Sequence, residues 1–128
     1  MIHVQRGPAP AALKSQAAQS RLKSAAKFFS LPVEKRRQQR HQFYPAILFK
    51  GVREELAKAF RNKCAYCESP VETDTGYEVD CHRPRSRAVN LDGTLSPDHY
   101  WWLIYEWDNL LFCCATCNKL KGSRFPVE

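Results

Sequence analysis

Two pairs of cysteines carry the strongest chemical signal in this sequence of 128 residues. Each pair encloses two residues: Cys64 is followed by Cys67, and Cys114 by Cys117. This spacing lets a tight turn aim two thiolates at one ion, and two such turns complete the tetrahedral four-sulfur shell of a structural Zn²⁺ site. The sequence therefore predicts a structural zinc ion held by these four cysteines.

Free core thiols or a redox pair are the alternatives for these cysteines. The N-terminal residues contain no apolar run of signal-peptide length, and no stretch approaches the ~20 apolar residues of a membrane span. We therefore expect a cytoplasmic protein, away from the membrane, whose thiols stay reduced. Cys113 directly precedes the second pair and is predicted to be a buried bystander.

Oxygen-bearing side chains near the cysteines suit a second, harder metal. Asp80 and Asn118 offer the oxygen ligands that Mg²⁺ or another divalent cation prefers, and such a cation on a scissile phosphate promotes phosphodiester cleavage. An N-cap for Asp80 and a helix cap for Asn118 are the competing interpretations. Basic side chains close to these motifs are expected to bind nucleic acid: Arg83, Arg85, Arg87, Lys119 and Lys121.

The positive charge of the chain is concentrated in its N-terminal half. Residues 1–63 hold 14 Lys and Arg against 3 Asp and Glu, a net charge of +11, whereas residues 64–128 have a net charge of −4. A segment this basic attracts polyanions because binding releases counterions. DNA is therefore the expected partner, and a solvated basic helix surface is the alternative.

The elements that must position these residues fall into two parts. We predict a basic helical segment over residues 1–62 and a zinc-bound unit over residues 63–128. In the first part the predicted helices cover residues 11–29, 32–42 and 46–61. The last helix rests on apolar residues at steps of four: Leu48, Val52, Leu56 and Phe60.

In the second part, helical periodicity stops and short elements are expected. The predictions are strands over residues 76–80 and 110–113, a turn over 91–94, and a helix over 115–121 that ends at Gly122. An aromatic cluster is predicted to pack as core, with base stacking as the alternative: Tyr100, Trp101, Trp102, Tyr105 and Trp107. The fold class is α+β.

Three stretches in combination resemble the HNH endonuclease superfamily, which has the ββα-metal fold: residues 79–86, 106–111 and 117–126. More narrowly, the chain is similar to the branch found as the nuclease subunit of Septu-type and retron-linked anti-phage systems. Residues 60–68, 100–103 and 122–126 are typical of that branch. The resemblance covers about residues 45–126. The predicted architecture is therefore a basic helical N-terminal segment followed by a zinc-stapled unit, for which the resemblance implies the ββα-metal (HNH) fold.

The resemblance also implies roles for individual residues and partners. Asp80 and Asn118 would hold the catalytic divalent cation, and Asn109 would brace the loop that aims the general base. The protein would be a DNA endonuclease acting in anti-phage defence beside an ATPase that senses the invader. The sequence contains no Gly-x4-Gly-Lys-Ser/Thr phosphate loop, so ATP chemistry would belong to that partner. Two non-catalytic alternatives stay open: a zinc-stabilised nucleic-acid-binding or adaptor module, and a zinc-ribbon protein–protein adaptor.

The sequence departs from the family pattern at the general base. The family places His directly after the acidic residue, where this chain has Cys81, and His82 comes one residue later. Because neighbouring side chains of a strand point to opposite faces, we expect His82 to point away from the metal unless a bulge re-aims it. An imidazole with a pKa near ~6.5 suits a base at neutral pH better than a thiol near ~8.5.

Three interpretations of this departure follow. A bulge turns His82 toward the metal so that it acts as the base, or Cys81 makes the enzyme weak or inactive. In the third interpretation, the chain is a nucleic-acid binder that has lost cleavage. We rank a nuclease with an altered base first. Members of this branch usually extend well past the Arg-Phe-Pro segment, whereas this sequence ends at Glu128.

Overall fold

The structure is a computed structural model that describes residues 4–39, 41–72, 77–98 and 100–125. The helices are α1 (Gln16–Phe29), α2 (Val33–Arg37), α3 (Val52–Ala59) and α4 (Ala115–Lys121). Short 3₁₀ turns cover Ala11–Lys14, Ala46–Leu48, Trp101–Leu103 and Trp107–Asn109. The strands are β1 (Tyr77–Cys81), β2 (Ala88–Val89), β3 (Leu95–Ser96) and β4 (Leu110–Cys114). The predicted mixture of helices and short strands is confirmed.

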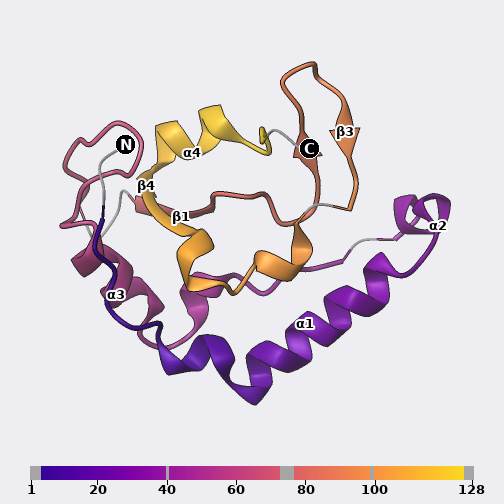
Figure 1. The fold of residues 1–128 in the computed structure, drawn as a ribbon, viewed down its shortest axis with the longest axis horizontal. Coiled ribbons are helices and arrows are strands. Elements are labelled where there is room, and N and C mark those ends of the chain that lie inside the picture. Colours follow the sequence, from indigo (N-terminus) through magenta and orange to yellow (C-terminus); the bar gives the residue numbers. More distant parts are fainter. Residues whose placement is uncertain (1–3, 40, 73–76, 99, 126–128) are drawn as a thin grey trace.

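Strands β1 and β4 form an antiparallel pair at the centre of the molecule. Tyr77 lies opposite Cys114 at one end of the pair, and Cys81 lies opposite Leu110 at the other. Helix α4 begins directly after β4 and packs on one side of the pair, while α3 lies on the other side (Figure 1). The two strands and helix α4 therefore contain or adjoin most of the residues that the sequence singles out.

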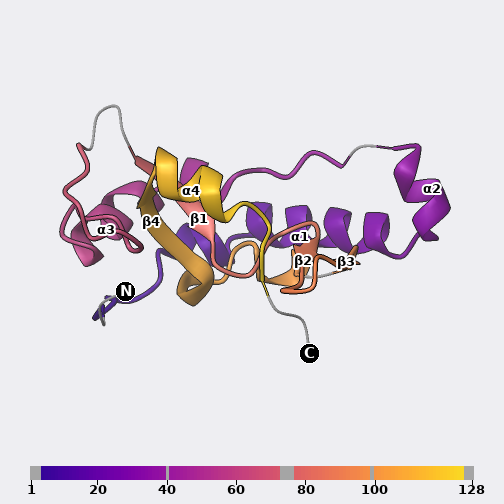
Figure 2. The same ribbon diagram turned by 90° about the horizontal axis from the view of Figure 1, so that it is seen from above.

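One hydrophobic core joins the N-terminal helices to this central pair. Leu13 and Ala18 belong to the same buried cluster as Leu56 of α3 and Phe112 of β4. Helix α1 extends from the central pair to α2 at the far end of the molecule (Figure 2). Residues on both sides of position 63 thus contribute to a single core.

The first two helices differ from their predicted ranges. The helix predicted over residues 11–29 is interrupted at Ser15, whose hydroxyl caps α1 by accepting a hydrogen bond from Ala18 N at 3.2 Å. Helix α2 ends at Arg37, earlier than the predicted Gln42. No regular element follows among the described residues before Ala46, and the His41 ring stacks on Phe28 with centroids 5.2 Å apart.

The helix predicted over residues 46–61 is wrong at its start. Residues Ala46–Leu48 form a separate 3₁₀ turn, and Gly51 has a left-handed φ of +84° before α3 begins at Val52. Glycine adopts this conformation without a Cβ clash, so the break costs little. Leu48 consequently leaves the apolar stripe and is 61% exposed, whereas Val52 and Leu56 are fully buried.

The predictions for the second half are closer. Helix α4 has the predicted bounds, β4 extends one residue further, and β1 is described from Tyr77 because residue 76 lies outside the described residues. The predicted turn over residues 91–94 connects β2 to β3, a hairpin that was not predicted. Three members of the aromatic cluster are buried as predicted, namely Tyr100, Tyr105 and Trp107, whereas Trp102 is exposed.

The segment after α4 runs beside β2. Val89 N donates to Ser123 O at 2.8 Å, and Phe125 N donates to Val89 O at 2.9 Å.

None of the helices in the described ranges has the length and apolarity that crossing a bilayer demands.

Candidate metal centre and acidic pocket

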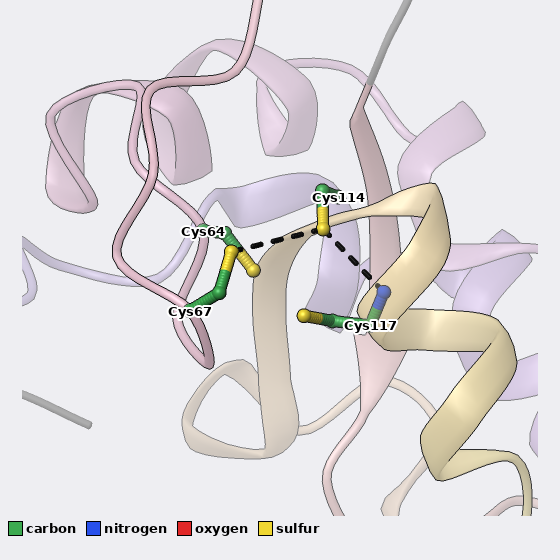
Figure 3. A group of neighbouring side chains, drawn as sticks. All are labelled: Cys64, Cys67, Cys114 and Cys117. Atoms are coloured by element: carbon green, nitrogen blue, oxygen red, sulfur yellow. Dashed lines mark hydrogen bonds between the residues drawn. The ribbon is translucent and has the colours of Figure 1, made fainter.

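The four predicted zinc ligands converge at one point. Their sulfur atoms all lie within 4.8 Å of one another, and Cys67 Sγ is 3.9 Å from Cys114 Sγ (Figure 3). Four sulfurs about 2.3 Å from a tetrahedral zinc ion lie about 3.8 Å apart. The residues present therefore fit one structural zinc ion.

Two turns from distant parts of the chain bring these sulfurs together. The first turn is anchored on β4, because Ala65 N donates to Phe112 O at 2.8 Å. Cys114 ends β4 and caps α4, and its Sγ accepts a hydrogen bond from Cys117 N at 3.4 Å. Tyr66 N donates likewise to Cys64 Sγ at 3.4 Å. Backbone N–H groups thus point at ligand sulfurs in both turns.

Cys67 and Cys117 differ in how readily their thiols lose a proton. Hydrogen bonds from Ser69 lower the pKa of Cys67 to about 6, so this thiol ionises readily. A hydrogen bond with Cys114 is the largest cause that raises the pKa of Cys117 to about 12. Zinc binds cysteine as the thiolate, so ligation would displace this proton. Cys113 is outside the cluster and fully buried, as predicted, and burial raises its pKa to about 12.

A second candidate site is a pocket of about 210 Å³ beside α4. Asp80 from β1 and Asn118 from α4 both line it, together with Cys81 and Arg85. His82 is not among the lining residues that the structure describes. The pocket therefore brings together the predicted cation ligands Asp80 and Asn118 and the neighbouring Cys81.

Asp80 is the most constrained residue of the pocket. Its side chain is buried, and its Oδ2 accepts a hydrogen bond from the Tyr66 hydroxyl. The same oxygen forms an ion pair with Lys121 Nζ at 3.0 Å, and Lys121 Nζ also donates to Cys81 O at 3.1 Å. One carboxylate oxygen is thus held by two partners from different elements.

Glu78 is an oxygen-bearing side chain that contacts Asn118 beside the pocket, although it is not one of the lining residues. Strand side chains alternate, so Glu78 and Asp80 share one face of β1, and Asn118 Nδ2 donates a hydrogen bond to Glu78 Oε2. Carboxylate and amide oxygens are the donors that Mg²⁺ prefers. The donor set at this pocket fits a hard divalent cation.

Asn109 fastens the loop that follows β1. It is buried, its Oδ1 accepts from Arg83 N at 2.8 Å, and its Nδ2 donates to Arg83 O at 3.2 Å. Its backbone oxygen accepts from His82 N at 2.9 Å. Both residues after Cys81 are therefore held by a single asparagine.

Cys81 and His82 occupy different surroundings. Burial raises the pKa of Cys81 to about 11, so the thiol keeps its proton at neutral pH. The His82 ring packs edge-on against Phe125 with centroids 5.2 Å apart, and burial lowers its pKa. Its Nδ1 is buried and has no hydrogen-bond partner among the described residues. Cys81 is among the residues that line the pocket, but it also packs against the hydrophobic core, and its protonated thiol is poorly suited to accept a proton.

The basic residues predicted to bind nucleic acid divide into four groups. Arg83 lies over the rings of Tyr100 and Phe125, at 5.3 Å and 5.0 Å from their centroids. Arg87 and Lys119 are exposed, whereas Lys121 pairs with Asp80. Arg85 is exposed and lines the pocket.

Sequence reasoning missed two residues of this site, Tyr66 and Glu78. Strand alternation is a signal that would have placed Glu78 beside Asp80. No local signal connects Tyr66 to Asp80, because that contact depends on how the first cysteine turn sits against β1.

Comparison with known proteins points to one group of relatives. The chain is 39% identical over 74 residues to Septu protein PtuA of Bacillus mycoides (strain KBAB4), covering 57% of this chain and 10% of that protein. It is 36% identical over 88 residues to Septu protein PtuB of the same strain, covering 66% of this chain and 30% of PtuB. For PtuB of Bacillus thuringiensis the identity is 31% over 68 residues, 53% of this chain and 22% of the relative.

The chain is related to Septu proteins over part of its length. It spans less than a third of the length of each of these three relatives. No family model matches the chain. No solved structure matches it either.

Proposed function

We propose that the chain is a metal-dependent HNH endonuclease that cleaves DNA as an effector of a Septu-type anti-phage defence system. Similarity to PtuA and PtuB supports the defence setting. The nuclease activity is supported by one observation above the others: Asp80 and Asn118 line a single pocket between a strand pair and a helix. Four clustered cysteines that could bind one metal ion connect the first cysteine turn to β4 and α4 beside this pocket.

In this proposal Asp80 and Asn118 hold a divalent cation, with Glu78 beside them. When bound, the cation supplies Lewis-acid stabilisation to the scissile phosphate. Arg85 lines the pocket and offers its charge to the DNA backbone. Asn109 keeps the loop after β1 in place through its hydrogen bonds to Arg83.

Cys81 makes the proposed enzyme a weak one. It lines the pocket at the position where the resembling family has its base histidine. Because burial raises its pKa to about 11, only a small fraction is thiolate at neutral pH. Proton removal from the attacking water is then the step that limits this nuclease.

The proposed partners are DNA and, by resemblance, an ATPase of the same defence system. DNA affinity is assigned to the basic N-terminal segment, where Lys14, Lys23 and Lys27 of the first two helical elements are exposed. Such lysines gain affinity by displacing counterions from the phosphates.

A catalytically silent, zinc-stabilised nucleic-acid-binding module is the second candidate. The Lys121 ammonium already neutralises Asp80, and the Cys81 thiol is protonated at neutral pH. Both observations favour a site that binds DNA without cutting it. The two candidates differ in one measurable property, divalent-dependent cleavage.

A plasmid-cleavage assay distinguishes them. We expect the chain to convert supercoiled plasmid to nicked or linear forms with Mg²⁺ or Mn²⁺, and Asp80→Asn to abolish this conversion. Asp92→Asn, at an exposed hairpin position, is the matched control and should cleave like the parent. A parent protein that binds plasmid but never cuts it would establish the silent module instead.

A further inference from the structure

We infer that Tyr66 is a positioning residue that links the zinc site to the pocket lined by Asp80 and Asn118. It holds the Asp80 carboxylate in place for a divalent cation. The inference rests on the proposed function, because it assigns a role toward the proposed cation. Tyr66 lies between two predicted zinc ligands in sequence, yet its hydroxyl contacts Asp80 in the other candidate site.

The backbone of Tyr66 belongs to the zinc site. Its N–H donates to Cys64 Sγ at 3.4 Å, and the preceding residue, Ala65, donates its N–H to Phe112 O at 2.8 Å. A zinc ion bound by Cys64 and Cys67 therefore fixes the backbone on either side of this tyrosine.

The hydroxyl of Tyr66 contacts Asp80, one of the residues that line the pocket. It donates a hydrogen bond to Asp80 Oδ2, and the ring is half-buried. A tyrosine hydroxyl carries its proton at neutral pH, so the phenol acts as the donor in this hydrogen bond. Tyr66 therefore restrains one oxygen of the carboxylate from the side of the zinc site.

Lys121 restrains the same oxygen from α4, at 3.0 Å. The two restraints differ, since a divalent cation that binds Asp80 repels the Lys121 ammonium but not a neutral phenol. Tyr66 is thus the restraint that can persist when a cation is bound. Hydrogen bonds to a metal-ligating group typically change metal affinity 10–100-fold when they are removed.

Tyr77 offers a matched control for a hydroxyl deletion. It lies on β1, three residues before Asp80, and stacks on Phe112 with ring centroids 4.7 Å apart. Its hydroxyl is buried without a hydrogen-bond partner in the part of the chain that the structure describes. Tyr77→Phe removes the same group as Tyr66→Phe but no contact to a carboxylate.

The experiment compares the zinc-loaded parent, Tyr66→Phe and Tyr77→Phe. Mn²⁺ binding is measured by electron paramagnetic resonance, zinc content by mass spectrometry, and plasmid cleavage as a function of Mn²⁺ concentration. We expect Tyr66→Phe to keep one zinc per chain and to bind Mn²⁺ about 10- to 100-fold more weakly. Its half-maximal Mn²⁺ concentration for cleavage should rise by the same factor, with the maximal rate recovered at saturation. Tyr77→Phe should match the parent in all three measurements.

Three results would overturn the inference: equal Mn²⁺ affinities for both variants, loss of zinc from Tyr66→Phe, or a parent that binds no Mn²⁺. Failure of the nuclease proposal has a different signature. A parent that binds Mn²⁺ but cuts no DNA contradicts the nuclease, while the Mn²⁺ affinities of the two variants still decide the role of Tyr66.

Discussion

Lys121 and Asp80 form an ion pair of 3.0 Å whose two side chains are 14% and 9% exposed. The ammonium therefore contacts one oxygen of the carboxylate that the proposed divalent cation would bind. Because both groups are largely buried, each depends on the other for its neutralisation. A bound divalent cation would take over this function of the lysine.

Replacing Lys121 by Met should make stability depend on divalent cations. Without them the variant loses about 3 kcal/mol of unfolding free energy, because the buried Asp80 charge is left unpaired. Added Mn²⁺ should restore much of this loss and raise the urea midpoint more than in the parent. Urea denaturation with and without Mn²⁺ measures both effects.

Lys119→Met is the control for this comparison, since Lys119 is an exposed lysine on the same helix. It should leave stability and its response to Mn²⁺ unchanged. If Lys121→Met responds to Mn²⁺ no more than Lys119→Met does, the pocket does not hold a cation at Asp80.

Zinc should be essential for folding. Cys64→Ser removes one of the four clustered sulfurs, and we expect it to lose zinc together with folding free energy on the order of 10 kcal/mol. Cys113→Ala is the control, because that buried thiol lies outside the cluster. Metal analysis of both variants, with circular dichroism, tests this. A Cys64→Ser protein that retains zinc and the parent's thermal midpoint would disprove the four-cysteine site.

The basic N-terminal segment should set the salt dependence of DNA binding. Deleting it would remove core residues such as Leu13 and Ala18, so charge substitutions are the cleaner test. If Lys23 and Lys27 contact phosphates, changing both to Gln should reduce the slope of log affinity against log salt by about 1.8, at ~0.9 per contact. Fluorescence anisotropy over a salt series measures the slope.

Gln16→Ala with Gln19→Ala alters two exposed neutral positions of the same helix and should leave the slope unchanged. An unchanged slope for the lysine variant as well would mean that α1 faces solvent or a protein partner.

Cys81→His should raise cleavage by about 10²–10⁴, the contribution of a well-placed general base. The pH dependence of cleavage should differ between the parent and this variant. With a thiol pKa of about 11, the thiolate fraction of the parent increases tenfold per pH unit between pH 7 and 9, and cleavage should rise in parallel. The histidine variant should instead level off above a pKa near ~6.5. Plasmid-cleavage rates from pH 5.5 to 9 measure both curves.

Cys81→Ala, which has neither thiol nor imidazole, is the reference for this series. If Cys81→His gives no gain while His82→Ala abolishes cleavage, the base is His82 and the interpretation of Cys81 is wrong.

Local sequence signals predicted the elements around the candidate site well. The bounds of α4 follow from a helix-forming run that stops at Gly122, and β4 follows from consecutive apolar residues. The clustering of four cysteines follows from their spacing alone. In each case the determining residues are neighbours in the chain.

Features that depend on tertiary contacts escaped prediction. The stripe from Leu48 to Phe60 suggests one helix, but the backbone at Gly51 breaks it, and periodicity does not register such a break. Strands β2 and β3 have two residues each, too few for a periodic signal. The Lys121–Asp80 ion pair joins α4 to β1, so only the packing of one on the other reveals it.

Cys114 is at once a predicted zinc ligand and the residue opposite Tyr77 in the β1–β4 pair. A slip of one residue between these strands would reverse their faces, turning Asp80 toward the core and Val79 toward α4. At the other end of the pair, the hydrogen bonds of Asn109 to His82 and Arg83 hold the connection between the strands in this register. Because ligation by all four cysteines requires Cys114 to meet the turn that carries Cys64, a zinc ion bound there would favour the observed register and, with it, the side chains that line the pocket.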